Sequence, residues 1–270
     1  AWRLAAVIVP GWIAVTLAAQ LSVLPVQLSV FGEASPHLYL NLLWVPVVEW
    51  AAQPLAYLGA LTVTWLPDAG KTLLALSGKV CAMMLASLEA MDARGWLTVH
   101  PVRRPMQPEV LGFYLLLGFL PWCAGMRARG RLAWLCLCAA LITGPWLWRA
   151  WEDGRDAVRL TMLDVGQGQA VLVEAKDGRR WLVDGGGSSS DTFDLGRAVL
   201  APTLTWGRAP ALSGVVMSHP DRDHTGGLAY LLETFDVGFL AGNGELPKFE
   251  DFTAALGKSG LTPLAWRAGE

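Results

Sequence analysis

Long runs of apolar residues in the first 150 positions constrain the fold of this chain more than any other feature. Three runs approach the roughly 20 apolar residues that a helix needs to cross a bilayer, namely residues 4–24, 109–126 and 132–148. We predict that each of them spans a membrane. The short arginine-rich segment 127–131 separates the last two, which predicts a tight transmembrane hairpin.

Two further segments are expected at the membrane without a simple crossing. Residues 38–66 are apolar but interrupted by Pro46 and Pro54, and they carry Glu49. Because a polar group in hydrocarbon is costly, Glu49 either faces a polar pathway or lies at the level of the headgroups, and we favour the second position. Residues 71–92 place apolar side chains at helical spacing between charged ones. That pattern predicts an amphipathic helix in the interface or along a groove.

The charge distribution divides the chain near residue 150. Residues 1–150 carry 10 Lys/Arg and 6 Asp/Glu, whereas residues 151–270 carry 11 and 17. The arginines of 127–131 predict a cytoplasmic loop, so the following span would deliver the second region to the outer face of the membrane. We therefore expect two domains, 1–150 and 151–270. Because the chain starts at Ala1 rather than Met and stops at Gly269-Glu270 without an obvious terminal element, we expect it to be a piece of a longer protein.

The second region has the pattern of an α/β domain. Lys176-Asp177-Gly178 lies between two apolar runs and predicts a hairpin turn. Strand–loop–helix units follow it, which predicts a layered α/β fold. The expected strands are 157–163, 171–175, 179–183, 214–217 and 237–241, and the expected helices are 194–206 and 227–235.

The segment SHPDRDHTGG, residues 218–227, is the main candidate for chemistry. It leaves the carboxyl end of the expected strand 214–217, where α/β folds place their sites. Imidazole and carboxylate groups bind divalent transition metals. The spacing lets His219 and Asp221 face one ion, and Asp223 and His224 a neighbouring ion about 3.5–4 Å away. A polar turn that caps the next helix is the alternative, but it explains only one or two of these four residues.

Three motifs together resemble a known family. LDVGQG (163–168), LVDGG (182–186) and HPDRDH (219–224) resemble the metallo-β-lactamase superfamily, whose signature is H-x-[HD]-x-D-H. In combination they are similar to the hydrolase domain of ComEC-type competence proteins. NLLWVP (41–46) also resembles part of that family's membrane domain. The resemblance implies an α-helical membrane region followed by an αββα domain, here truncated.

The resemblance also implies roles for individual residues. It assigns four metal ligands, two for each ion, and these are His219, Asp221, Asp223 and His224. Asp223 is in addition the expected catalytic residue. Asp164 and Asp184 would lie beside the site and orient the ligands, or alternatively serve only as turn residues. A carboxylate at Asp221, where the superfamily more often has a histidine, favours Mn²⁺ or Mg²⁺ relative to Zn²⁺.

Two departures from the family pattern bear on activity. Gln169 occupies a position where the family usually has a carboxylate. The 46 residues after His224 contain no histidine, so the later ligands of the superfamily site are absent from this sequence. We therefore expect the chain alone to be inactive and its longer parent to be a hydrolase.

The function implied by the resemblance is DNA uptake in natural transformation. It predicts a multi-pass inner-membrane channel for single-stranded DNA, with a metal-dependent phosphodiesterase that degrades the strand left outside. Membrane lipid and other DNA-uptake proteins are the expected partners. A transporter with an inactive hydrolase-like appendage, and a membrane-tethered metallo-hydrolase of another substrate, are the alternatives. The acidic balance of 151–270 is unusual for a region that handles DNA.

Overall fold

The computed structural model describes residues 2–37, 39–155, 157–187 and 193–266, and the side chains from residue 10 onward within these ranges. Its contacts divide the chain into two units. The first contains Ala1–Val23 and Ala34–His100, and the second contains Leu24–Glu33 and Pro101–Glu270. The short strands β1 (Glu33–Ala34) and β2 (His100–Pro101) lie where the chain passes between the units.

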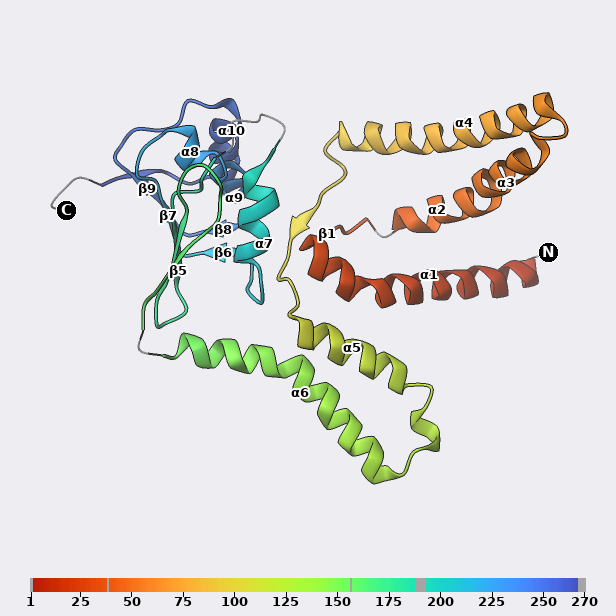
Figure 1. Cartoon of the computed structure of the whole chain (residues 1–270), viewed down its shortest axis with the longest axis horizontal. Helices are drawn as coiled ribbons and strands as arrows, with labels where there is room; N and C mark the ends of the chain where they lie inside the picture. Colours follow the sequence, from red (N-terminus) through yellow and green to blue (C-terminus); the bar gives the residue numbers. More distant parts are fainter. Residues whose placement is uncertain (1, 38, 156, 188–192, 267–270) are drawn as a thin grey trace. The chain divides into compact units, whose positions relative to one another are not determined.

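Helices make up almost all of the first unit (Figure 1). They are α1 (Trp2–Phe31), which ends in the second unit, then α2 (Tyr39–Val47), the π-helical turn η1 (Val48–Ala52), α3 (Gln53–Thr62) and α4 (Pro67–Asp92). Helices α3 and α4 fold back on each other, and the hydroxyl of Ser77 donates to the carbonyl of Ala52 at 2.8 Å. The expected interruption near Pro46 and Pro54 is this single π-helical turn, because proline removes a backbone donor from the helix. Glu49 is exposed in η1.

Among the described residues, three segments are long and apolar enough to cross a membrane: Pro10–Phe31, Pro67–Asp92 and Ala128–Asp153. Two of them contain the predicted spans 4–24 and 132–148, apart from the first residues of 4–24. The third contains residues 71–92, for which we expected an amphipathic helix at the interface or along a groove. By length and composition this helix could also cross the membrane, because its most apolar part contains few charged side chains.

The predicted span 109–126 is wrong. Helix α5 (Gln107–Phe119) has 13 residues and is therefore about 20 Å long, too short for a hydrocarbon core of about 30 Å. Pro121 follows its end, and proline has no backbone N–H with which to continue the helix, although Leu120 itself still has helical geometry. The chain then makes the 3₁₀ turn η2 (Cys123–Gly125).

Helix α5 nevertheless folds back on α6 (Ala128–Asp153), although of these two helices only α6 is long enough for the predicted transmembrane hairpin. The indole of Trp134 donates to the carbonyl of Leu115 at 3.2 Å, and its ring stacks on Phe119. The arginine-rich segment does not form a separate loop, because α6 begins at Ala128 and carries Arg129 and Arg131 in its first turn.

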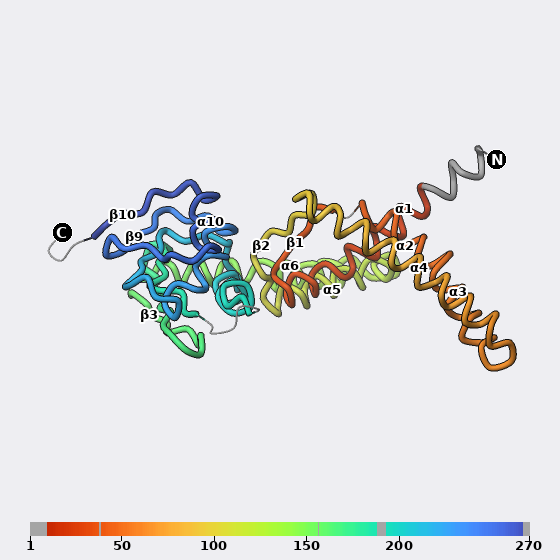
Figure 2. Tube along the Cα trace, turned by 90° about the horizontal axis from the view of Figure 1, so that it is seen from above, coloured from red at the N-terminus to blue at the C-terminus, as the bar shows by residue number. Residues whose placement is uncertain are grey.

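A six-stranded mixed sheet organises the rest of the second unit, in the order β10-β9-β7-β5-β4-β3. Strands β3, β4 and β5 are antiparallel neighbours, and the other pairs are parallel. Figure 2 shows β3 and β10 at opposite edges of this domain. The strands are β3 (Arg159–Met162), β4 (Val171–Glu174), β5 (Arg180–Val183), β7 (Gly214–Val216), β9 (Leu240–Gly242) and β10 (Leu264–Ala265), with a separate parallel pair of β6 (Ala211–Leu212) and β8 (Asp236–Val237).

The core lies between one face of the sheet and its helices. Leu172, Leu182, Val215 and Leu240 are in register across four strands, and all are buried. On the opposite face Leu160 and Met162 are exposed. The helical segments are η3 (Gly196–Leu200), α7 (Ala201–Leu204), α8 (Arg222–Thr225), α9 (Leu228–Thr234) and α10 (Glu250–Ser259). The chain thus has a helical N-terminal region with apolar helices, followed by an α/β region with a mixed sheet. This confirms the predicted fold class.

Several predicted elements differ in detail. The expected helix 194–206 is a π-helical turn followed by the four-residue α7. The expected strand 237–241 is divided between β8 and β9, because Gly238 donates to the carbonyl of Leu212 while Leu240 pairs with β7. The predicted hairpin turn is present, with Gly178 at φ +77° between β4 and β5.

Arg180 fixes the loop between α7 and β7 against the sheet. Its guanidinium is buried and donates to three backbone carbonyls, those of Leu204, Ala209 and Ala211, at 2.6–2.8 Å. Burial, and after it the charge of Arg208, lowers the pKa of Arg180 to about 10. The group is therefore still charged at neutral pH, with the charges of Glu174 and Asp153 partly offsetting the effect of burial.

We predict that Arg180→Met destabilises this domain by about 2–4 kcal/mol, because three buried carbonyls lose their donor. Arg179→Met is the matched control, since that side chain is exposed and pairs with exposed Asp177, and it should cost less than about 0.5 kcal/mol. The measurement is the temperature at which the domain becomes protease-sensitive in the detergent-solubilised protein. Equal temperatures for both variants would contradict the role of Arg180.

Candidate metal centre

The parallel pairing of β5 and β7 brings two motifs to one edge of the sheet. Strand β5 ends at Val183 and β7 at Val216, which are register partners. Asp184 follows the first strand directly, and the loop before α8 follows the second. The carboxyl ends of parallel strands are where α/β folds place ligands, and here the neighbouring strands present LVDGG and SHPDRDHTGG side by side.

Three of the four expected metal ligands lie together. His219, Asp223 and His224 each offer a ligand atom, and these atoms lie within 4.8 Å of one another. The imidazole centroids are 3.7 Å apart, and Asp223 Oδ2 is 3.6 Å from His224 Nε2. Asp221 lies outside this group of three. Its carboxylate is 3.6 Å from His219 Nε2 and its side chain is 73% exposed.

Asp184 holds one imidazole of the cluster in a defined orientation. Its side chain is 3% exposed, and Oδ2 accepts a hydrogen bond from His224 Nδ1 at 2.8 Å. The same carboxylate accepts from the backbone N–H and the hydroxyl of Ser218, both at 2.7 Å. With the proton on Nδ1, the Nε2 atom of His224 is free to bind a cation, as in the carboxylate–histidine arrangement of metal sites. Asp184 has φ +60°, a conformation that Asp and Asn adopt more readily than most residues.

Asp164 is placed differently from Asp184. It is exposed, and it is not part of the cluster of possible ligands. Its neighbour Val165 is buried in the core. Among the described residues, the sequence motif LDVGQG therefore contributes to the site through its glycines and backbone.

Backbone hydrogen bonds hold three chain segments together around the cluster. Gly185 donates to the carbonyl of His224 at 2.6 Å, Gly186 donates to that of Gln169 at 2.7 Å, and Gln169 donates to that of Asp223 at 3.3 Å. A Cβ atom on Gly168 would collide with the carbonyl oxygen of Asp223, and one on Gly187 with that of Arg222. Our sequence reasoning missed this function of the two glycines, although both stand in glycine-rich motifs that signal a close backbone approach.

The donor set fits a divalent transition metal. Two imidazoles and a carboxylate are ordinary ligands for such ions, and the Asp184–His224 bond supplies the orienting contact that metal sites use. When bound there, a divalent ion would act as a Lewis acid toward an oxygen of the substrate. The chain's own residues position the imidazoles and hold a proton on His224 Nδ1.

Fold and site define a class: an α/β domain with a histidine–aspartate cluster at its strand ends, preceded by helices that can cross a membrane. Comparison with protein families agrees with that class. Residues 1–127 match the competence protein family, and residues 163–263 match the metallo-beta-lactamase superfamily. The two matches in this order fit a ComEC-type competence protein, as the sequence motifs predict. The competence match and the three apolar helices indicate a membrane protein.

Two curated relatives extend the similarity over most of the chain. The chain is 30% identical over 247 residues to "Uncharacterized protein YcaI" of Escherichia coli (strain K12), which covers 87% of this chain and 30% of that protein. It is 25% identical over 238 residues to "ComE operon protein 3" of Bacillus subtilis (strain 168), with 83% and 30% covered. The chain thus spans 30% of the length of these relatives. No solved structure matches it.

We predict that Asp184→Asn weakens binding of Mn²⁺ or Zn²⁺ by about 10–100-fold, because the carboxylate that orients His224 loses its charge. Asparagine adopts positive φ readily, so the backbone should be kept. Isothermal titration calorimetry of the purified protein with each metal measures the affinity. Asp177→Asn, which alters an exposed turn carboxylate, is the control. An unchanged affinity in Asp184→Asn would contradict the orienting role.

Proposed function

We propose that this chain is part of a DNA-uptake channel of the inner membrane and that its second domain belongs to a metal-dependent phosphodiesterase. The proposed domains are 1–150, a part of the competence-type membrane region, and 151–270, a part of the hydrolase domain. The observation that carries the proposal is the cluster of His219, Asp223 and His224, oriented by Asp184, in a chain that also matches the competence protein family.

The proposed division of the ligands between two ions is the one that the family resemblance implies. His219 and Asp221 would face one divalent ion, and Asp223 and His224 the other. His224 offers Nε2 because Asp184 accepts the hydrogen bond from Nδ1. Asp223 is exposed beside both imidazoles, where it can meet a cation and a phosphodiester together. Mn²⁺, Mg²⁺ and Zn²⁺ are the candidate ions, and a carboxylate at Asp221 in place of a histidine favours the first two.

The proposed substrate is single-stranded DNA on the outer face of the membrane. In this arrangement the strand that does not enter the channel is degraded by phosphodiester hydrolysis. The acidic balance of 151–270 gives this domain little general attraction for DNA. We therefore propose that the channel, and other DNA-uptake proteins, deliver the strand to the cluster.

We predict that the full-length protein in detergent cleaves a labelled single-stranded oligonucleotide only when Mn²⁺, Mg²⁺ or Zn²⁺ is added. Asp223→Ala should reduce cleavage to the level without metal, because it removes one of the clustered ligands. Asp251→Ala should cleave like the wild type. Asp251 is similarly exposed, at 53% against 57% for Asp223, but it lies on α10 outside the cluster.

The two possible failures have different meanings. If the folded wild-type protein cleaves with none of the ions, the chain belongs to a transporter with an inactive hydrolase-like appendage. If Asp223→Ala and Asp251→Ala both retain cleavage, the activity arises elsewhere, and the cluster is not its site.

A further inference from the structure

A second cluster of charged side chains lies at the opposite end of the buried sheet face from the metal cluster. Arg159, Glu174 and Arg180 are register partners across β3, β4 and β5 and form a charged row at this edge. The end of α6 adds Arg149, Glu152 and Asp153. All of these residues belong to the second unit of the structure.

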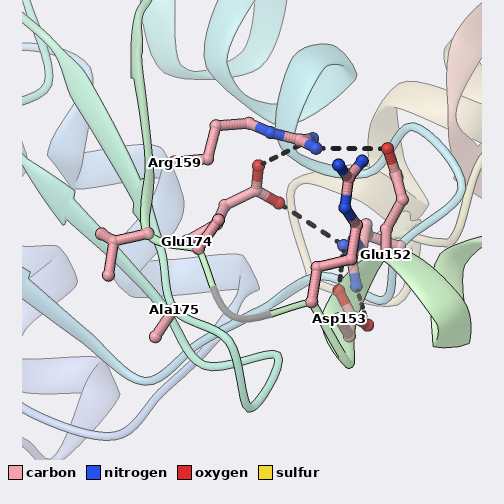
Figure 3. Close-up of a pocket in the computed structure, with 9 residues that line it drawn as sticks. Glu152, Asp153, Arg159, Glu174 and Ala175 are labelled. Carbon is pink, nitrogen blue, oxygen red and sulfur yellow. Dashed lines mark hydrogen bonds and ion pairs between the residues drawn. The ribbon is translucent and has the colours of Figure 1, made fainter.

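A hollow of about 390 Å³ opens between this row and α7. Its lining holds one described acid, Glu174, and five arginines: Arg104, Arg149, Arg159, Arg180 and Arg208. Figure 3 shows the adjoining pocket, in which Glu174 and Glu152 both approach Arg159. Asp153 pairs with Arg208 through two hydrogen bonds of 2.5 Å. Counting these three acids against the five arginines leaves an excess of two positive charges.

The arginines also have hydrogen-bonding capacity left over. Within the described parts of the chain, the Nε atoms of Arg149 and Arg208 are buried and lack an acceptor. Buried donors are nearly always paired in native proteins, so two of them beside one hollow indicate an acceptor that the chain does not supply.

The hollow lies at the level where membrane-spanning segments end. Trp146, Trp148 and Trp151 on α6 are each about half exposed, and tryptophans of this kind mark the membrane interface. Arg149 is about 4.5 Å further along the helix than Trp146, within a headgroup layer roughly 5–7 Å thick. Arg104 lines the same hollow and donates to the carbonyls of Ser29 and Val30 in the last turn of α1. Two candidate spans therefore end at this hollow.

We propose that the hollow binds the phosphate group of an anionic phospholipid headgroup. A phosphate offers several oxygen acceptors and negative charge, which are the two things that the arginines lack. The position of the hollow beside the ends of α1 and α6 favours a lipid over DNA as the source of the phosphate. Such a lipid would fasten the α/β domain to the membrane through residues remote from the metal cluster, independently of hydrolysis.

The test is native mass spectrometry of the full-length protein in detergent, titrated with phosphatidylglycerol and, separately, with phosphatidylcholine. Thr203→Glu places a carboxylate at the hollow, which Thr203 lines as an exposed residue. It should weaken phosphatidylglycerol binding by about tenfold and leave the weaker phosphatidylcholine binding unchanged. Arg159→Gln, which removes a half-exposed guanidinium, should act in the same direction.

Thr253→Glu is the matched control. Like Thr203, Thr253 is exposed and its hydroxyl donates to the carbonyl four residues earlier, but it lies on α10. It should bind phosphatidylglycerol like the wild type, and an unchanged metal affinity will show that both threonine variants are folded. Equal phosphatidylglycerol affinities for the folded Thr203→Glu variant and the wild type would overturn the proposal. So would inorganic phosphate binding as tightly as the lipid, or Thr203→Glu weakening only the binding of a short single-stranded oligonucleotide.

Discussion

The close approach of three backbone segments at the carboxyl ends of β5 and β7 is the contact on which the candidate metal site depends. Gly168 and Gly187 pass so near the carbonyls of Asp223 and Arg222 that a side chain at either position would collide with them. The backbone N–H of Gln169 donates to the same Asp223 carbonyl. The ligand-bearing loop is therefore held by backbone packing and hydrogen bonds, before any cation contributes.

These backbone contacts do not depend on which side chain stands at residue 169. Gln169 stands where the family usually has a carboxylate, but its backbone N–H donates to Asp223 of the loop and its carbonyl accepts from Gly186, contacts that any residue except proline can make. The orienting carboxylate is instead Asp184, which is buried and bonded to both Ser218 and His224. A ligand whose orientation is fixed by such a partner loses less freedom when it binds a metal. The sheet, through the pairing of β5 with β7, thus sets the geometry of the imidazoles.

Local patterns predicted much of this structure, and long-range contacts account for what they missed. The hairpin β4–β5, the strand β7 and the ligand loop follow from apolar alternation and turn residues, which are encoded within a few positions. Helix α5 is shorter than its apolar run because Pro121 ends it, a signal that hydrophobicity alone conceals. The three carbonyl partners of Arg180 are 24 to 31 residues away, and no local pattern contains that spacing. The grouping of His219 with Asp223 and His224, leaving Asp221 aside, likewise depends on how the loop turns into α8.

The measurement that tests the central claim most directly compares metal affinity in Gly168→Ala and Gly166→Ala by isothermal titration. Both glycines have positive φ, +100° and +71°, so alanine strains the backbone at both. Only at Gly168 would the added Cβ meet the Asp223 carbonyl, whereas nothing lies within 4 Å of it at Gly166. The account predicts that Gly168→Ala loses at least about tenfold more metal affinity than Gly166→Ala. A displacement of the loop that costs about 1.4 kcal/mol is enough for a tenfold loss of affinity. Equal affinities in two folded variants would contradict it, and the loop would then owe its position to something other than the glycine contact.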